Sequence, residues 1–162
     1  MTSNSAGLQN ELARRHRTAT LIVAGFFILD IALVAIAFLT ADRIHRPGDP
    51  SIEMGLWIAV LVFGLGAFVF RRTKFAAMRL KDIAALKGLS GLLKTLQDTT
   101  IRVACIGGAI ALMGFVITIL TGDWTKMLRA GGVSAIVLIY CFPSRSAWER
   151  VVIQLGRDDL AG

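Results

Sequence analysis

A run of 23 residues, 18–40, carries a single charged side chain, Asp30. A helix needs about 20 consecutive apolar residues to cross the hydrocarbon core of a bilayer. The run is therefore predicted to be a transmembrane helix. A cleaved signal peptide does not fit, because the apolar segment of such a peptide is only about 7 to 15 residues long.

Three further apolar runs follow along the chain. Residues 54–70 and 103–122 contain no charged side chain, and both runs are long enough to cross a bilayer. The fourth run, 124–142, is weaker because the charged ends of Lys126 and Arg129 must extend to the membrane surface. The sequence thus predicts an all-α integral membrane protein with a single membrane domain over residues 1–162. Its four transmembrane helices, at about 18–40, 54–70, 103–121 and 125–142, are expected to form two hairpins.

The composition fits this class, because 55% of the 162 residues are hydrophobic and only 18% are charged. In a soluble protein, the net charge of +7 would suggest a nucleic-acid partner, but here the charges are sorted along the chain. The segments before the first span, between the second and third, and after the fourth hold 14 of the 18 Lys and Arg residues. The positive-inside rule therefore predicts a bacterial-type cytoplasmic membrane, with both termini in the cytoplasm and no nucleic-acid partner.

Aromatic residues give a second indication of this topology. Trp57 and Trp124 lie near the predicted outer ends of their spans, and Tyr140 and Trp148 lie at the inner boundary. Trp and Tyr are enriched at both interfaces of a membrane. These four side chains are predicted to act as interfacial anchors.

The connector between the second and third spans, residues 71–99, is too long for a simple turn. Its apolar residues recur at helical spacing opposite lysines: Phe75, Met78, Ile83, Leu86, Leu89, Leu93 and Leu96 against Lys74, Lys81, Lys87 and Lys94. This pattern predicts a basic amphipathic cytoplasmic helix, with a turn between Gly88 and Gly91. Such a helix would dock an acidic partner or anionic lipid headgroups, or it is a solvated connector that follows the positive-inside rule. A short interfacial helix is predicted in the tail, at residues 144–156.

Asp30 is the one ionisable residue near the middle of a predicted span. A carboxylate there costs at least about 2.5 to 3.5 kcal/mol and must be neutral, paired or hydrated. Ser134 of the fourth span shares its depth, and Arg129, roughly 7 Å of helix rise nearer the outside, could reach inward. We predict an intramembrane polar site of Asp30, Ser134 and Arg129. It is either a buried contact that fixes helix packing or part of an ion or proton path.

Small residues mark the faces along which the helices can approach closely. The patterns are Ala104-x-x-x-Gly108 and Gly107-x-x-x-Ala111 in the third span, Gly131-x-x-x-Ala135 in the fourth, and Gly64 in the second. Small residues at this spacing permit close backbone contact between membrane helices. They favour packing within the chain first and contact with another subunit second.

No cofactor or metal site is predicted. His16 and His45 lie outside the spans and on opposite sides of the membrane, which excludes bis-histidine haem ligation inside the bundle. Cys105 and Cys141 lack a C-x-x-C spacing and are interpreted as small apolar residues. The sequence also offers no nucleophile, base and metal ligands at one depth, so an integral-membrane enzyme ranks last.

Two functional hypotheses remain. The preferred one is a small non-catalytic subunit or scaffold of a larger membrane complex, whose partners are the lipid bilayer and other membrane subunits or further copies of itself. The alternative is an ion or proton transporter, or an element of a channel, that uses Asp30. Isolation in a stoichiometric complex would favour the first hypothesis, and isolation as a lone homo-oligomer would favour the second.

Overall fold

The computed structural model describes residues 2–46, 48–74, 77–144, 146 and 148, with the backbone alone at residues 2–6, 8, 42, 74 and 77–89. It contains the α-helices α1 (Thr2–Ile44), α2 (Pro50–Lys74), α3 (Ala77–Thr121) and α4 (Trp124–Cys141). No strand occurs in the described part of the chain. The predicted all-α class is confirmed.

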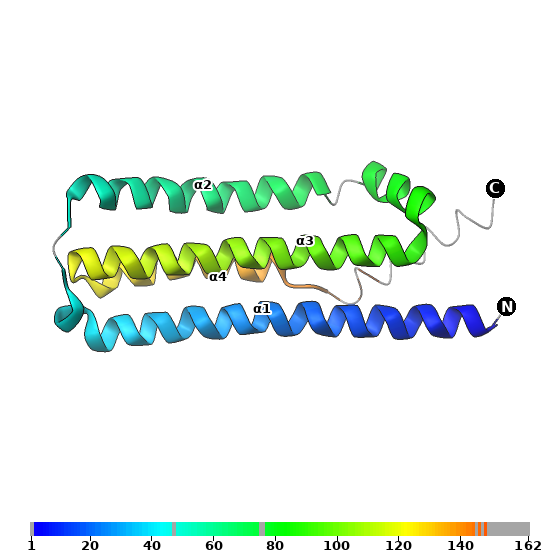
Figure 1. Ribbon diagram of the computed structural model, residues 1–162, viewed down its shortest axis with the longest axis horizontal. Coiled ribbons are helices and arrows are strands. Elements are labelled where there is room, and N and C mark those ends of the chain that lie inside the picture. The colour runs from blue at the N-terminus through cyan, green and yellow to red at the C-terminus, as the bar shows by residue number, and fades with distance from the viewer. Residues whose placement is uncertain (1, 47, 75–76, 145, 147, 149–162) are drawn as a thin grey trace.

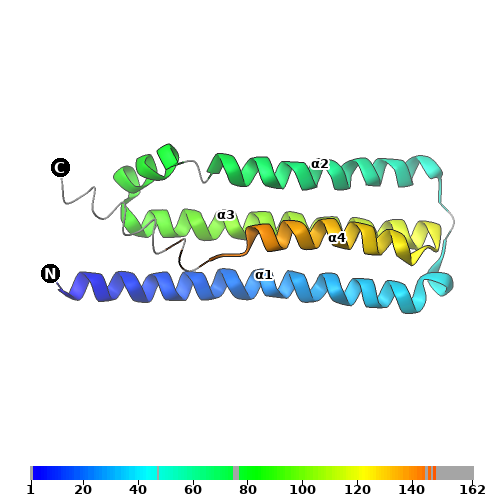
Figure 2. The same cartoon turned by 180° about the vertical axis from the view of Figure 1, so that it is seen from behind.

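The helices lie side by side, with α1 and α2 at opposite edges of the bundle and α3 and α4 between them (Figure 1, and from behind in Figure 2). α3 packs against each of the other three helices. In its most apolar 18-residue stretch 50% of the residues are buried, against 22% in α1 and 17% in α2. α3 is therefore the central helix, and α1 and α2 turn most of their apolar surface outward.

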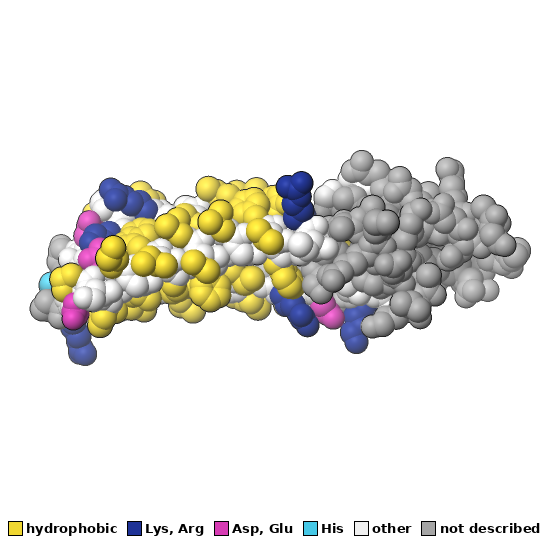
Figure 3. Space-filling view, turned by 90° about the horizontal axis from the view of Figure 1, so that it is seen from above, with side chains coloured by type: hydrophobic (Ala, Val, Ile, Leu, Met, Phe, Trp, Pro, Cys, Tyr) yellow, Lys and Arg dark blue, Asp and Glu magenta, His cyan; other side chains and the backbone are white. Residues whose placement is uncertain are grey.

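Large apolar side chains cover the outside of the bundle. Leu39 is 72% exposed, Leu65 69% and Met54 68%. Figure 3 shows a broad apolar band with Lys and Arg side chains at both of its ends. Soluble monomers rarely expose contiguous apolar surface on this scale. Three helical segments, Gln9–Ala41, Pro50–Thr73 and Ser90–Thr121, are long and apolar enough to cross a membrane, so the chain has the surface of a membrane protein.

α4 is the shortest helix. Its 18 residues rise about 27 Å, which is close to the roughly 30 Å of a hydrocarbon core. Lys126 and Arg129 lie in its first two turns, and α4 is not among the three helices above. Its full crossing, and with it the arrangement of four spans in two hairpins, stays a prediction.

α1 and α3 are much longer than a membrane is thick. The 43 residues of α1 rise about 65 Å, roughly twice the thickness of a hydrocarbon core, and the 45 residues of α3 measure about 67 Å along the helix, which is bent in its first turns (Figure 1). Both begin at the same end of the bundle, which we call the terminal end (Figure 1). There the guanidinium of Arg15 donates a hydrogen bond of 3.2 Å to the side-chain oxygen of Gln97, which joins α1 to α3. The two helices thus continue together beyond the apolar band.

The connector is helical, and the chain turns back within it. α3 is one helix from Ala77 through Gly88 and Gly91, so no non-helical residue separates these glycines. Its first turns run on in the direction of α2, and the rest of the helix runs back along the bundle (Figures 1 and 2). The predicted return of the chain thus takes the form of a bend inside α3. A glycine inside a helix costs only about 1 kcal/mol relative to alanine. The leucines that follow hold the helix by packing, since Leu92, Leu93 and Leu96 are buried; the first turns of α3 are angled against the rest (Figure 1).

Part of the predicted connector and tail lies outside the described residues. The structure does not describe the side chains of the amphipathic pattern from Lys74 to Leu89, nor most of the predicted interfacial helix 144–156. In that second segment it describes Ser144, Ser146 and Trp148. Docking of lipid headgroups on the connector therefore stays a prediction.

The opposite end of the bundle, which we call the hairpin end, is closed by backbone contacts between its two loops. Gly122 has a φ of 69°, a left-handed conformation that favours glycine, and its N–H donates to the carbonyl of Thr118. The N–H of Arg46 donates to the carbonyl of Ile119 at 2.9 Å, which attaches the loop after α1 to the end of α3. The two loops therefore form one unit.

Candidate functional site

Asp30 lies near the middle of the apolar part of α1 and is only 4% exposed. Its side chain interacts with that of Ser134 in α4. Among the described residues, its Oδ1 oxygen has no hydrogen-bond partner. A buried polar atom without a partner is unusual in a folded protein, and inside a membrane it marks a functional candidate.

Ser134 links two of the helices that surround this carboxyl group. It is fully buried, and its hydroxyl donates a hydrogen bond of 2.9 Å to the carbonyl of Gly107 in α3. A hydroxyl has one proton to donate. Ser134 is thus shared between the carbonyl of Gly107 and the side chain of Asp30, and Oδ1 of Asp30 is left without a hydrogen-bond partner among the described residues.

Arg129 lies apart from Asp30 and Ser134. Its side chain is exposed, whereas Gly131, two residues further along α4, faces Asp30: a Cβ atom added to Gly131 would be 3.1 Å from Asp30 Oδ1. Positions two residues apart on a helix point about 200° apart, so Arg129 faces away from the carboxyl group. Of the three predicted site residues, the structure brings together Asp30 and Ser134 and leaves Arg129 outside.

A cavity of about 490 Å³ lies between α1 and α4 and includes Asp30. Its small residues are Ala35 in α1 and Gly131, Gly132 and Ala135 in α4. Larger apolar side chains complete the lining: Phe27, Ile31, Val34, Phe38, Trp124 and Leu128. The cavity opens to the outside of the bundle, because Ile31 is 59% exposed and Leu128 51%.

A second cavity of about 470 Å³ continues along the same two helices toward the terminal end. It shares Phe27 with the first cavity and is otherwise lined by Val23, Ala24, Ile28, Leu138, Ile139 and Phe142. All of these side chains are apolar. We call the two cavities together the α1/α4 groove; Asp30 is its one charged residue.

The other predicted small residues serve contacts within the bundle. A Cβ atom on Gly108 would be 2.5 Å from the ring of Phe26 in α1, and one on Gly107 would be 3.0 Å from Leu138 in α4. Gly64 of α2 similarly faces Val133 of α4. Ala104 and Ala111 are fully buried. Only Gly131 and Ala135 of the predicted set line the α1/α4 groove.

The predicted aromatic anchors occupy different environments. Trp124 packs edge to face on Phe38 at 5.1 Å between ring centroids, and Tyr140 packs on Phe68 at 4.3 Å. The guanidinium of Arg71 lies 4.5 Å from the centre of the Tyr140 ring. Trp57 is half-buried against the core.

Trp148 is buried within the chain. It is 3% exposed and lies edge to face with the ring of His16 at 5.6 Å. His16 Nε2 also lies 2.9 Å from the carbonyl oxygen of Pro143, to which the protonated nitrogen donates. The segment after α4 is thus attached to α1, a contact between residues 127 positions apart that sequence periodicity could not reveal.

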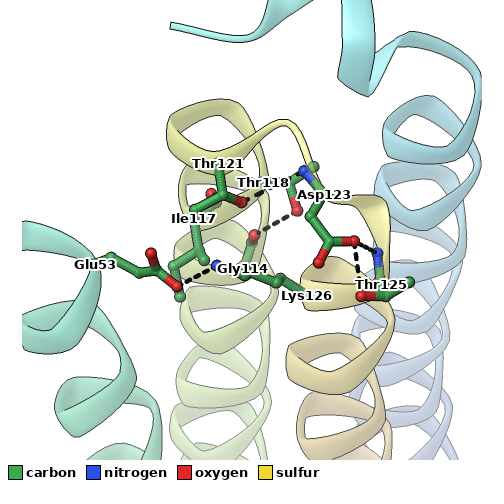
Figure 4. A network of polar contacts seen from close by, with 8 residues as sticks. All are labelled: Glu53, Gly114, Ile117, Thr118, Thr121, Asp123, Thr125 and Lys126. Atoms are coloured by element: carbon green, nitrogen blue, oxygen red, sulfur yellow. Dashed lines mark hydrogen bonds and ion pairs between the residues drawn. The ribbon is translucent and has the colours of Figure 1, made fainter. Parts of the chain in front are cut away.

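A polar network at the hairpin end is also absent from the predicted sites (Figure 4). Asp123 caps α4, because its carboxylate accepts hydrogen bonds from the Thr125 hydroxyl at 2.7 Å and the Thr125 N–H at 2.9 Å. These bonds hold the pKa of Asp123 below its usual value. Lys126 forms an ion pair with Glu53 and so joins α4 to α2. The Gly122-Asp123 pair before an apolar run was the available sequence signal for the cap.

The described residues contain no cluster of three or more His, Cys, Asp or Glu side chains that could hold a metal ion. No protein family, curated protein or solved structure matches the chain. The function must therefore be argued from the α1/α4 groove and its carboxyl group.

Proposed function

We propose that this protein is a small non-catalytic subunit of a larger membrane complex, and that it docks a transmembrane helix of another subunit in the α1/α4 groove. In this proposal four helices cross the membrane, both termini lie in the cytoplasm, and the complex resides in a bacterial-type cytoplasmic membrane. The observation that carries it is the buried carboxyl group of Asp30, with an oxygen that has no hydrogen-bond partner among the described residues, beside an open groove.

The shape of the groove supports a helix as its occupant. Gly131, Gly132 and Ala135 leave room for close approach of a backbone, which is how membrane helices associate in the absence of a hydrophobic driving force between them. Exposed basic residues at the terminal end support a cytoplasmic location of that end, because the cytoplasmic side of a membrane protein is enriched in Lys and Arg. These residues are Arg14, Arg17, Arg72, Lys94 and Arg102. The long helices α1 and α3 would then extend into the cytoplasm.

Site-specific crosslinking during purification tests this proposal. A photoreactive amino acid is placed at Ile31 in the groove or at Val62 on α2, two positions with exposures of 59% and 62%. We expect a stoichiometric complex in mild detergent and one crosslinked product of defined mass from position 31 only. The substitution Gly132→Leu should abolish that product, because Gly132 lines the groove and a Cβ atom there has no neighbour within 4 Å, so the added side chain would occupy the groove.

The proposal would be overturned if the chain were isolated alone and position 31 crosslinked only to lipid or to a second copy. Equal crosslinking of one protein from positions 31 and 62 would also contradict it, since contact would then not depend on the groove.

Transport of an ion or a proton through Asp30 is the second candidate, because the same carboxyl group lies at mid-depth with an oxygen without a partner among the described residues. The lining of the groove does not favour a path for an ion or a proton, because none of its residues other than Asp30 carries an ionisable side chain. Proton flux into liposomes decides between the two. Flux through the isolated chain that disappears in Asp30→Asn, with unchanged assembly, would favour transport over docking.

A further inference from the structure

We infer that the helix docked in the α1/α4 groove belongs to a different protein and carries a basic side chain, Lys, Arg or His, at the depth of Asp30. The inference rests on the docking function proposed above and adds the chemistry of the partner. It follows from the charge of the groove, its length and the composition of this chain's own helices.

Among the described residues, no basic side chain pairs with the carboxyl group of Asp30. Lys126 is paired with Glu53, Arg129 faces away, and the contact with Ser134 leaves Oδ1 of Asp30 without a hydrogen-bond partner among the described residues. Ionisable residues inside membranes pair with one another or face water, because an isolated charge in hydrocarbon is costly. A basic side chain would supply both a hydrogen-bond donor and the opposite charge, whereas a neutral donor would supply only the first.

The length of the groove indicates that the partner segment crosses the membrane. Lining residues run along α4 from Trp124 to Phe142, which is about 27 Å of helix. This is close to the thickness of a hydrocarbon core. A helix laid along the whole groove therefore crosses the membrane, and Asp30 lies opposite an inner position of that helix, away from its charged ends.

A lipid does not provide the missing group, and a second copy of this chain offers it from only one side chain. An acyl chain has no donor. Residues 18–40, 54–70 and 103–121 contain no Lys, Arg or His, and Lys126 and Arg129 lie in the first two turns of α4, at the hairpin end. The cation of a second copy that comes nearest to this depth is Arg129, which is about 3 Å of helix rise from Gly131, the residue that faces Asp30. Crosslinking of position 31 to a second copy would therefore overturn the assignment of the groove to another protein.

Model transmembrane peptides test this chemistry without knowledge of the partner. The full-length chain is placed in lipid nanodiscs, and binding of labelled 23-residue Leu/Ala helices is measured by energy transfer. The peptides differ only in their central residue, which is Lys, Asn or Leu. We expect the Lys peptide to bind about fivefold or more tightly than the Leu peptide, the size of a strong polar contact between model membrane helices.

Matched variants assign the preference to the groove. Asp30→Asn should remove the advantage of the Lys peptide and keep the binding of the Leu peptide. Gly132→Leu should weaken all three peptides, whereas Gly66→Leu on α2 should weaken none; a Cβ atom at either glycine has no neighbour within 4 Å, so both variants should fold. Circular dichroism and thermal unfolding check that they do.

Equal binding of the Lys and Leu peptides, or stronger binding of the Asn peptide, would overturn the basic partner. Tight binding of the Lys peptide to Asp30→Asn would overturn it as well. These outcomes differ from a failure of the proposed function, which would appear as the absence of any complex in native membranes.

Discussion

Two carboxyl groups of this chain lie in opposite surroundings. Asp123 accepts two hydrogen bonds from Thr125 at the start of α4, in the loop at the hairpin end. Asp30 is buried in the bundle, and one of its oxygens has no donor among the described residues. The first carboxylate is therefore explained by the helix that it caps, and the second is not explained by the described fold alone.

Removal of the cap should show in the stability of the isolated chain. Asp123→Ala should lower the free energy of unfolding by about 1 kcal/mol at neutral pH, the usual cost of a lost N-cap. Because the pKa of Asp123 is lowered in the folded state, the charged carboxylate stabilises the fold at any pH above 3.8, the pKa of this group in the unfolded chain. This stabilisation is lost as the pH falls through the lower pKa that Asp123 has in the folded chain.

Unfolding in detergent at pH 7 and pH 3 measures the effect, with Asp123→Asn as control because an amide oxygen can still cap the helix. A difference between wild type and Asp123→Ala that grows on acidification would contradict the assignment.

Asp30 should contribute little to the stability of the chain by itself. Asp30→Asn should change the free energy of unfolding by less than about 1 kcal/mol, since polar contacts between membrane helices average about 0.6 kcal/mol. Asp30→Leu should cost no more, because Arg129 faces away and is not stranded. A loss of several kcal/mol in either variant would reveal a basic partner within the chain.

At the level of elements, apolar runs predicted much of the helical pattern. The fourth predicted span ended at residue 142, and α4 ends at Cys141. The start of α1 at Thr2 was missed because residues 2–17 are mostly polar, and their helix relies on tertiary contacts such as the buried Leu12 and the Arg15–Gln97 bond. The pairing of Ser134 with Gly107 depends on how helices rotate against one another, which a single sequence does not specify.

The closest approach of α3 and α4 provides a test of the packing. A Cβ atom on Gly114 would be 2.4 Å from Cβ of Ala130, a contact that only a backbone shift can relieve. Gly114→Ala should therefore destabilise the bundle by about 1 to 3 kcal/mol. Gly132→Ala is the matched control and should be neutral or slightly stabilising, because its Cβ would meet nothing. Equal stability of the two variants in thermal unfolding would contradict this packing.

For the whole molecule, the arrangement places both loops at one end and the starts of α1 and α3 at the other (Figure 1). The proposed topology assigns the hairpin end to the outside and the terminal end to the cytoplasm. Ser51 and Ser90 are exposed and lie near these two ends, so they report on the assignment.

Cysteine labelling in intact cells should place these residues on opposite sides. In a background of Cys105→Ala and Cys141→Ala, Ser51→Cys should react with an impermeant maleimide added outside, and Ser90→Cys should react only after the cells are opened. Labelling of Ser90→Cys from outside would reverse the proposed topology. If Ser51→Cys and Ser90→Cys both reacted only after the cells were opened, α2 would not cross the membrane.

The unbroken course of α1 gives the molecule a lever. Asp30, in the groove proposed to bind the partner, and Arg15, beyond the apolar band, belong to one uninterrupted helix. A tilt of about 10° at Asp30 would move the start of α1 sideways by about 7 Å, because about 42 Å of helix separates Asp30 from Thr2. A change of the molecule bound in the groove would thus move the start of α1, beyond the apolar band, without any hinge in that helix.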